Sequence, residues 1–324
     1  MKYEAHLRQK SIQDRFPEVF SKTKTILFEA LALKWLDLHS RHYKAPSSHK
    51  RDQGVIRNYL IPFFHDRDAN RITAEMVQKY MATRRDTKSE KTGRPPSPST
   101  VNRELEILQK IFNDGVRWKD VRANPCLGVR SFPEAMPNSE FLSVEEVSVL
   151  LDVAHPEDAP LFACAVYLGM RRGELMNLSR DSVDLSNLQV FVDVGSATSG
   201  TTKSKKGRIL PIPLRLKPYL EQTLKGNSPW VFPSKRDRMK PRDEVRKAFE
   251  SALLRAGVTR KIRFHDLRHT FASHYVMAGG DLISLKDLLG HSSLQMVQRY
   301  AHLAPDHARK NINRLDFSSA KIER

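Results

Sequence analysis

Apolar side chains recur at helical spacing through the first third of the chain. Phe28, Leu31, Trp35 and Leu38 would form a stripe on one face of a helix, with Trp35 in the core. Three more stripes follow, with members Val55, Tyr59 and Leu60, then Met76, Val77, Tyr80 and Met81, then Val101, Leu105, Leu108, Ile111 and Phe112. Pro62 should end the second helix, and residues 87–100 should form a loop. We therefore expect a small unit of about four helices.

A break in this periodicity predicts a second domain. The segment NPCLGVRSFPEAMPNSE (124–140) carries three prolines and has the composition of a linker. Directly after it, Ser143 and Glu146 have the spacing of a capping box before an apolar run. Helices should therefore begin the second domain, at about 144–155 and 160–172.

The pattern then changes from helical spacing to alternation. QVFVDV (189–194) has strand composition, and RILPIP (208–213) alternates after a turn at SKKG (204–207). Helices should resume at about 213–225, 243–256, 265–278, 284–289 and 293–302. The expected fold class is mainly α: an N-terminal helical bundle followed by an α+β domain with one small antiparallel sheet.

Five segments describe the domain organisation that these patterns predict. They are a basic arm at 1–24, a helical domain at 25–130, a linker at 131–140, a second domain at 141–305 and a tail at 306–324.

Composition indicates which class of partner the protein binds and in which cellular compartment it works. The 55 Lys and Arg residues exceed the 37 Asp and Glu residues and give a formal net charge of +18, which favours a nucleic-acid partner. Cys126 and Cys164 are far apart and predict reduced, packed thiols of a cytosolic protein. MKYEAHLRQK (1–10) lacks the apolar core of a signal peptide, and the apolar run LFACAVYLGM (161–170) is too short to span a bilayer. We therefore expect a cytoplasmic, nucleoid-associated protein without a membrane partner.

The stretch FHDLRHTFASH (264–274) permits two chemical interpretations. His265 and His269 are four residues apart, as in a helical zinc motif, and His274 or His291 could supply a third ligand. However, Arg268 would place a fixed cation beside the metal with no carboxylate to neutralise it. We therefore expect no metal and no cofactor.

Other segments supply further cations and donors in a definite order. YLGMRRGELMNL (167–178) comes first, followed by TTKSKKGRILPIP (201–213), HDLRH (265–269) and LLGHSSLQMVQRYAHL (288–303). Arg171 should end an apolar helix, Gly290 should end another, and Ser292 or Ser293 should cap the next. Arginine, lysine and histidine donors together favour an anion, and a phosphodiester is the natural one for so basic a chain.

At these residues the chain resembles the tyrosine recombinases, the phage integrase family, over about residues 25–310. GMRRGEL is similar to the family's first arginine box, HDLRH to its H-x-x-R box, and LLGH followed by RY to its terminal box. The resemblance implies a SAM-like core-binding domain followed by a catalytic domain of the DNA breaking-rejoining fold.

The resemblance also implies roles for individual residues. Arg171 and Arg268 would clamp the non-bridging oxygens of the scissile phosphate, and His291 matches the family's second histidine. Tyr300 would be the nucleophile and form a 3′-phosphotyrosine link. Its phenol has a pKa near ~10, so the arginines would have to favour the phenolate and stabilise the transition state.

The resemblance also implies residues for proton transfer and for support. His265 could accept the tyrosine proton, and Lys203 could protonate the leaving 5′-oxygen. Lys205 and Lys206 remain alternatives to Lys203, because three lysines crowd this hairpin. Glu174 would be a buttress, and His269 would have a structural role. The candidate DNA contacts are Lys205, Lys206, Arg208, Lys235, Arg236, Arg238 and Lys240.

The implied activity is site-specific recombination that integrates or excises a mobile element. The family acts as a homotetramer on double-stranded DNA, through a Holliday junction and in some cases with DNA-bending or directionality proteins. A cellular Xer-like resolvase of the same family, a nicking-closing topoisomerase and a non-catalytic DNA-binding protein on this fold are alternatives.

Overall fold

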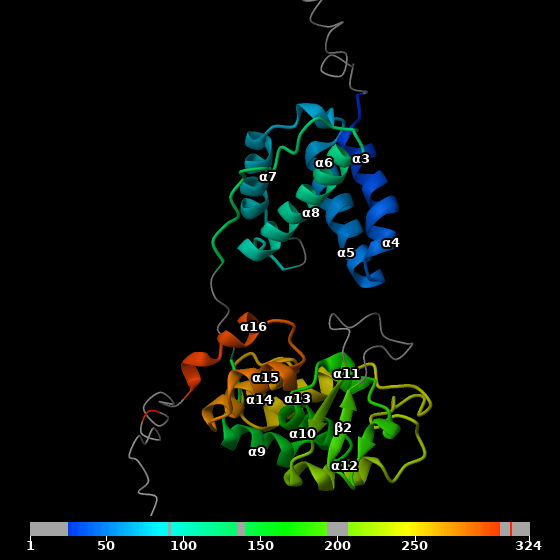
Figure 1. The fold of residues 1–324 in the computed structure, drawn as a ribbon, viewed down its shortest axis with the longest axis vertical. Coiled ribbons are helices and arrows are strands. Elements are labelled where there is room, and N and C mark those ends of the chain that lie inside the picture. The colour runs from blue at the N-terminus through cyan, green and yellow to red at the C-terminus, as the bar shows by residue number, and fades with distance from the viewer. Residues whose placement is uncertain (1–24, 90–91, 135–139, 193–206, 305–311, 313–324) are drawn as a thin grey trace, which may run out of the picture. The chain divides into compact units, whose positions relative to one another are not determined.

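The structure, a computed structural model, describes residues 25–89, 92–134, 140–192, 207–304 and 312. The chain forms two compact units, Met1–Met136 and Pro137–Arg324 (Figure 1). The predicted arm, most of the tail and the turn at 204–206 lie outside the described residues.

Unit 1 is helical. Helix α3 (Phe28–Trp35) continues through a π-helical turn (Leu36–Ser40) into α4 (Arg41–Tyr43). Helix α5 (Pro46–Val55) continues through a second such turn (Ile56–Leu60) into α6 (Ile61–Phe64). A 3-10 turn (Ala69–Arg71), α7 (Ala74–Asp86) and α8 (Pro98–Arg117) complete the unit.

The predicted stripes form the core of unit 1, with Phe28, Leu31 and Trp35 fully buried. Leu38 and Tyr59 are exceptions, at 46% and 40% exposure, because each lies in a wider π-helical turn that moves it off its stripe. Pro62 does not end its helix as predicted. The helix runs on through Pro62 to Phe64, because the π-helical turn directly before the proline already departs from the regular α-helical bonding that a proline breaks.

Two boundaries in unit 1 also differ from prediction. Helix α8 begins at Pro98 with Ser97 as its cap, so the loop predicted to reach residue 100 ends earlier. The proline-rich segment packs in part against unit 1, where Cys126 and Val129 are buried. The side chain of Asn102 accepts from the N–H of Phe132 at 2.8 Å and donates to its carbonyl at 2.9 Å.

Unit 2 begins with α9 (Val144–Val153), whose Ser143–Glu146 capping box is confirmed. Next come α10 (Ala159–Leu168), α11 (Arg172–Met176), a 3-10 turn (Arg180–Ser182), β1 (Val183–Asp184), β2 (Gln189–Val192) and β3 (Arg208–Pro211). The rest comprises a 3-10 turn (Leu214–Leu216), α12 (Lys217–Thr223), α13 (Arg246–Arg255), α14 (Asp266–Met277), α15 (Leu282–Leu289), α16 (Gln295–Gln298) and a 3-10 turn (Ala301–Leu303).

The predicted small antiparallel sheet is confirmed, with strand order β1-β2-β3. Val190 pairs with Leu210, and both are buried, whereas the neighbouring pair Phe191 and Ile209 is exposed. One face of the sheet therefore belongs to the core, as alternation requires.

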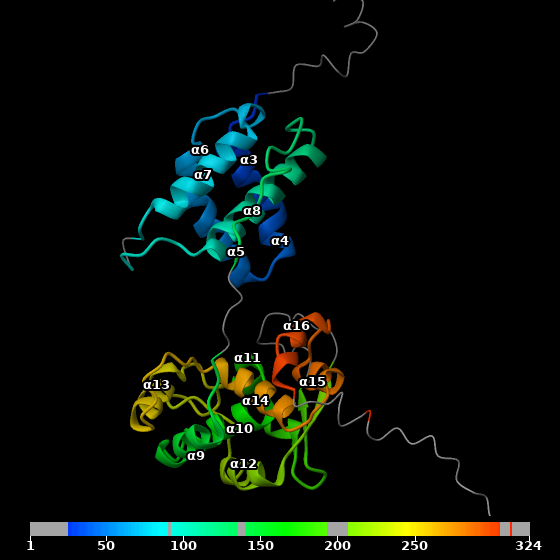
Figure 2. The same ribbon diagram turned by 90° about the vertical axis from the view of Figure 1, so that its left-hand side faces the viewer.

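Helix α10 is the centre of unit 2. It is buried along almost its whole length and packs against α9, α12 and α14 (Figure 2). It ends at Gly169, whose φ of +58° is left-handed and which the ring of Phe271 on α14 contacts closely. This close approach brings the end of α10 against α14, the helix that carries Arg268 and has His265 at its N-cap position.

Candidate active site

Arg171 begins a helix instead of ending one. Helix α10 ends at Leu168, two residues pass through the Gly169 turn, and Arg171 is the N-cap of α11. Its backbone N–H and Nη1 each donate to Glu174 at 2.8 Å. Its Nη2 donates to the carbonyl of Gly290 at 2.7 Å. These bonds hold the guanidinium at the start of α11.

Glu174 joins two arginines. Arg208 at the start of β3 donates to its carboxylate at 2.7 and 3.1 Å, in addition to the bonds from Arg171. Burial by itself would raise the pKa of Glu174, but the bonds and charges of Arg208 and Arg171 outweigh it and lower the pKa to about 2. The carboxylate is therefore ionised at neutral pH and neutralises part of the local positive charge.

Arg268 on α14 is buried, with 5% of its surface exposed. It donates to the carbonyls of Gly169 at 2.7 Å and Leu289 at 2.5 Å, and to His291 Nε2 at 2.9 Å. Burial and the charge of Arg171 lower the pKa of Arg268 to about 9, so the side chain stays cationic at neutral pH.

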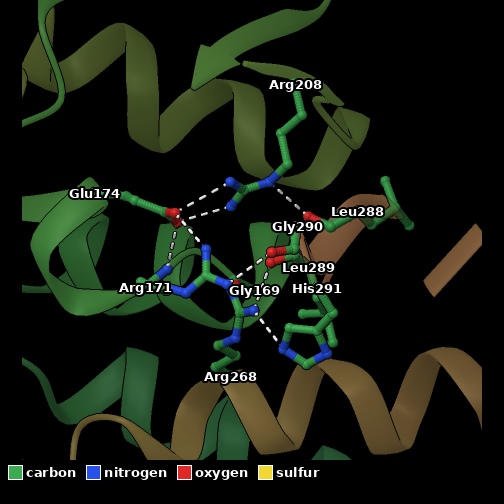
Figure 3. Close-up of polar contacts among 9 residues, drawn as sticks. All are labelled: Gly169, Arg171, Glu174, Arg208, Arg268, Leu288, Leu289, Gly290 and His291. Carbon is green, nitrogen blue, oxygen red and sulfur yellow. Dashed lines mark hydrogen bonds and ion pairs between the residues drawn. The ribbon is translucent and has the colours of Figure 1, made fainter. Parts of the chain in front are cut away.

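The end of α15 holds three arginines in place (Figure 3). Arg208 donates to the carbonyl of Leu288 at 2.8 Å, Arg268 to that of Leu289, and Arg171 to that of Gly290. The last carbonyls of a helix have no partners within the helix and carry partial negative charge. They therefore accept cations readily, and this helix end fixes three guanidinium groups relative to one another.

His291 follows this helix end. Burial and the charges of Arg268 and Arg171 lower its pKa to about 4, so the ring is neutral at neutral pH. Because Nε2 accepts from Arg268, the ring proton lies on Nδ1. Nδ1 is buried and has no hydrogen-bond partner within the described part of the chain. It is therefore a donor available beside the arginines.

Tyr300 does not lie on a helix, contrary to the predicted helix at 293–302. Helix α16 covers only Gln295–Gln298, and its N-cap position is Leu294, so the predicted caps Ser292 and Ser293 were wrong. The Tyr300 side chain is 3% exposed and packs in a small cluster of apolar residues, which are Ala272, Val276, Leu285, Leu289 and Val297.

The hydroxyl of Tyr300 is hydrogen-bonded to Nδ1 of His269 on α14. The sequence analysis predicts only a structural role for His269 and misses this contact. The available signal was the spacing of His265 and His269 on one face of a helix, which raised the question of a metal. His265 itself is exposed and lies at the N-cap of α14.

The predicted DNA contacts differ in how accessible they are. Lys203, Lys205 and Lys206 lie outside the described residues. Arg208 is 11% exposed in its side chain and bonded to Glu174 and Leu288, so its position fits a buttress better than a DNA contact. The remaining four, in the loop between α12 and α13, are exposed, and they are Lys235, Arg236, Arg238 and Lys240.

The described residues contain no group of three or more His, Cys, Asp or Glu side chains that could hold a metal ion. None of their helices is both long and apolar enough to cross a membrane.

Comparison with known proteins gives sequence relatives. The model of the phage integrase family matches residues 140–307. The integrase of Haemophilus phage HP1 is 33% identical over 285 residues, which are 85% of this chain and 76% of that protein. The integrase of Escherichia phage 186 is 32% identical over 65% of this chain and 58% of its own length. The tyrosine recombinase XerC of Alcanivorax borkumensis is 30% identical over 65% of this chain and 71% of its own length.

Solved structures show the fold. The Tn1549 transposon integrase, in complex with a circular intermediate DNA, has a TM-score of 0.74 at 16% identity and covers 90% of this chain and 100% of its own. A lambda integrase dimer bound to a COC′ core site has a TM-score of 0.68 at 16% identity and covers 84% of this chain and 97% of its own. The mainly helical fold with a small antiparallel sheet is thus that of known integrases.

Proposed function

The chain belongs to the phage integrase family of tyrosine recombinases, and from this premise we propose that Tyr300 attacks DNA at a specific site. The enzyme is a site-specific DNA recombinase that cleaves and rejoins strands through a 3′-phosphotyrosine intermediate. The observation that carries the proposal is the set of three arginines fixed by the end of α15, the helix that is followed by the segment leading to Tyr300.

The arginines suit a phosphate with developing charge. Arg171 and Arg268 bind the non-bridging oxygens, and their bonds to carbonyls use only part of the five N–H donors of each guanidinium. Because the bonds exist before DNA binds, little reorganisation is needed when the pentacoordinate transition state forms. The Nδ1–H of His291 is a further donor to the same phosphate.

The reaction exchanges one phosphodiester for another. The Tyr300 oxygen bonds to phosphorus as the bond to the 5′-oxygen breaks, and the tyrosine proton passes to a base. Lys203 protonates the leaving 5′-oxygen, with Lys205 and Lys206 as alternatives. The link conserves the bond energy, so a 5′-hydroxyl of another strand reverses the step without ATP.

We assign unit 1 as a core-DNA-binding domain and unit 2 as the catalytic domain, with segment boundaries as predicted. Double-stranded DNA is the partner, in keeping with the complexes of the Tn1549 and lambda integrases. Assembly as a homotetramer and help from DNA-bending or directionality proteins are parts of the same proposal.

Two functions within the family are candidates. Integration or excision of a mobile element is favoured by the phage integrases, of which the HP1 protein aligns with 85% of this chain. A cellular resolvase is favoured by the XerC relative at 30% identity. Cleavage of DNA from the flanks of the chain's own gene supports the first, whereas cleavage of a chromosomal site elsewhere supports the second.

The test of the nucleophile is covalent trapping. Wild type and Tyr300→Phe are incubated, with a chelator present, with labelled DNA that is nicked so that the religating end diffuses away. A denaturing gel then separates free DNA from protein-linked DNA. We expect a shifted band from wild type only, with DNA binding retained in both. A Tyr300→Phe protein that still becomes linked to DNA would contradict the assignment.

A further inference from the structure

His269 contacts the oxygen that we propose as the nucleophile. Its Nδ1 is hydrogen-bonded to Tyr300 Oη, and the two ring centroids are 6.0 Å apart with an interplanar angle of 44°. Helix α14 places His269 one residue after Arg268, so the proton partner of the tyrosine and the phosphate clamp share one rigid element. The ring of His265 packs edge-on against the ring of His269, with the ring centroids 5.9 Å apart.

Burial keeps both members of the pair neutral. Burial, together with the cations Arg299 and Arg268 and the neighbouring His265, outweighs Asp266 and lowers the pKa of His269 to about 4. Burial raises the pKa of Tyr300, although Arg299 and Arg268 oppose this. At neutral pH an uncharged imidazole therefore faces a protonated phenol.

The direction of the hydrogen bond follows from this state. A phenol is a better donor than a neutral imidazole, and an imidazole nitrogen is a better acceptor than a phenol oxygen. Tyr300 therefore donates its O–H to Nδ1, and the His269 ring proton lies on Nε2. This is the arrangement in which a base receives the proton of a nucleophile.

We propose that His269 is the base that removes the proton of Tyr300 during strand cleavage, an inference that rests on the proposed function of Tyr300. As the Tyr300 oxygen bonds to phosphorus and the bond to the 5′-oxygen breaks, the phenolic proton moves to Nδ1. The 5′-oxygen takes its proton from the lysine named above. In the reverse step, Nδ1 returns the proton to the departing tyrosine oxygen.

Bound DNA makes His269 a stronger base than it is alone. A phosphodiester held by Arg171 and Arg268 adds negative charge beside His269 and offsets the cations that now lower its pKa. The transfer is thus favoured when substrate occupies the site. His265, which we predicted would be the base, is the second ring of the pair, and its charge state affects that of His269.

Two substitutions separate proton transfer from positioning. His269→Phe removes the acceptor, whereas His269→Asn can still accept a hydrogen bond but cannot take the proton. We expect both to slow covalent trapping by about 100-fold or more, the usual scale of general-base catalysis, with DNA binding and thermal unfolding near wild type. His302→Phe, at an exposed histidine two residues after Tyr300, is the matched control and should cleave like wild type.

The possible results test the role of Tyr300 as nucleophile separately from the role of His269 as base. If Tyr300→Phe still forms an adduct, the proposed function fails. If Tyr300→Phe is inactive but His269→Phe cleaves as fast as wild type or faster, the base is another group and His269 only holds the resting tyrosine. If His269→Asn alone recovers wild-type rate, His269 is a positioning residue and not the base.

The pH profile supplies a readout that a structural role would not change. We expect the wild-type cleavage rate to vary little between about pH 6 and pH 9. In His269→Phe the rate should instead rise about tenfold per pH unit, because only the small phenolate fraction of Tyr300 can react. Parallel profiles for the two proteins would overturn the proposal.

A measurement without DNA tests the contact itself. Nitrogen NMR of protein labelled in its histidine rings should show His269 as a neutral ring with its proton on Nε2. Tyr300→Phe should shift the Nδ1 resonance of His269, while the resonances of His302 should stay in place. An unchanged His269 resonance would contradict the hydrogen bond on which the proposal stands.

Discussion

Glu174 compensates the positive charge of two arginines at the site. Its side chain is 4% exposed and lies between Arg171 and Arg208, each within 2.8 Å. Arg268 adds a third guanidinium held by the same helix end. Removing one partner of a buried ion pair leaves a charge without compensation, which costs far more than losing an exposed pair. Glu174 therefore compensates the charges of Arg171 and Arg208 in their buried positions.

We predict that Glu174→Gln lowers the free energy of unfolding by about 3 kcal/mol at pH 7, because an amide cannot neutralise two arginines. Denaturant unfolding followed by circular dichroism measures the effect. Glu157→Gln, at an exposed carboxylate 3.4 Å from Lys235, is the control and should change stability by less than about 0.5 kcal/mol. Equal effects at the two positions would show that burial of the Glu174 pair contributes nothing.

The stability difference between wild type and Glu174→Gln should also depend on pH. The folded-state pKa of Glu174, about 2, is below the value near ~4.3 of an unfolded chain. Its contribution is therefore complete above about pH 4.3 and is lost as the pH falls toward 2. We expect the stability difference between wild type and Glu174→Gln to shrink across this window. Glu146, whose pKa its bond to Arg260 also lowers to about 2, is present in both proteins and cancels.

At the scale of elements, the end of α15 organises the site. Asp281 caps the start of this helix, and Gly290 ends it with a left-handed φ of +63°. The carbonyls that this ending leaves free are those that bind the three arginines. A glycine is needed at position 290 for a second reason, since an added Cβ would lie 2.9 Å from Nη1 of Arg208.

We predict that Gly290→Ala displaces Arg208 from Glu174 and Leu288 and slows covalent trapping at least about tenfold. It should also cost more stability than the roughly 1–2 kcal/mol of a left-handed alanine. Gly257→Ala is the matched control, because Gly257 has a φ of +73° with nothing within 4 Å of the added Cβ. Gly257→Ala should lose stability through backbone strain but cleave normally. Equal cleavage rates would mean that Arg208 can move without consequence.

Two features describe the molecule as a whole, namely a separate hydrophobic core in each unit and a large positive net charge. Each unit has its own buried cluster, and the net charge of +18 far exceeds what the site alone uses. Cations beyond the site are available for phosphates along the DNA, where they add affinity without sequence information.

We predict that the affinity of the full chain for duplex DNA falls steeply with salt, with a log-log slope that counts its phosphate contacts. Arg236→Ala and Arg238→Ala, at exposed positions, should each reduce that slope by about 1 without changing site preference. Arg246→Ala, at an arginine already paired with Glu250 at 2.7 Å, is the comparison and should leave the slope unchanged. Fluorescence anisotropy over a series of salt concentrations measures all four proteins.

Much of the fold could be predicted from local sequence. The stripe from Val101 to Phe112 is buried as expected, the Ser143 capping box forms, and Gly290 ends its helix. These features depend on residues within a few positions of one another, which periodicity and capping chemistry describe well. Errors arose where the local rule has exceptions, as at Pro62 and at Arg171, which starts α11 after the Gly169 turn.

Most side chains of the candidate site could be identified from the sequence, because they lie in the short boxes that resemble the family. What these side chains contact depends on the tertiary structure. Arg208 meets Glu174 across 34 positions, Arg171 meets Gly290 across 119, and His269 meets Tyr300 across 31. Such contacts depend on how α10, α14 and α15 pack, and no spacing within one segment carries that information. That packing made Arg208 a buttress and placed His269, set aside as structural, against the tyrosine oxygen.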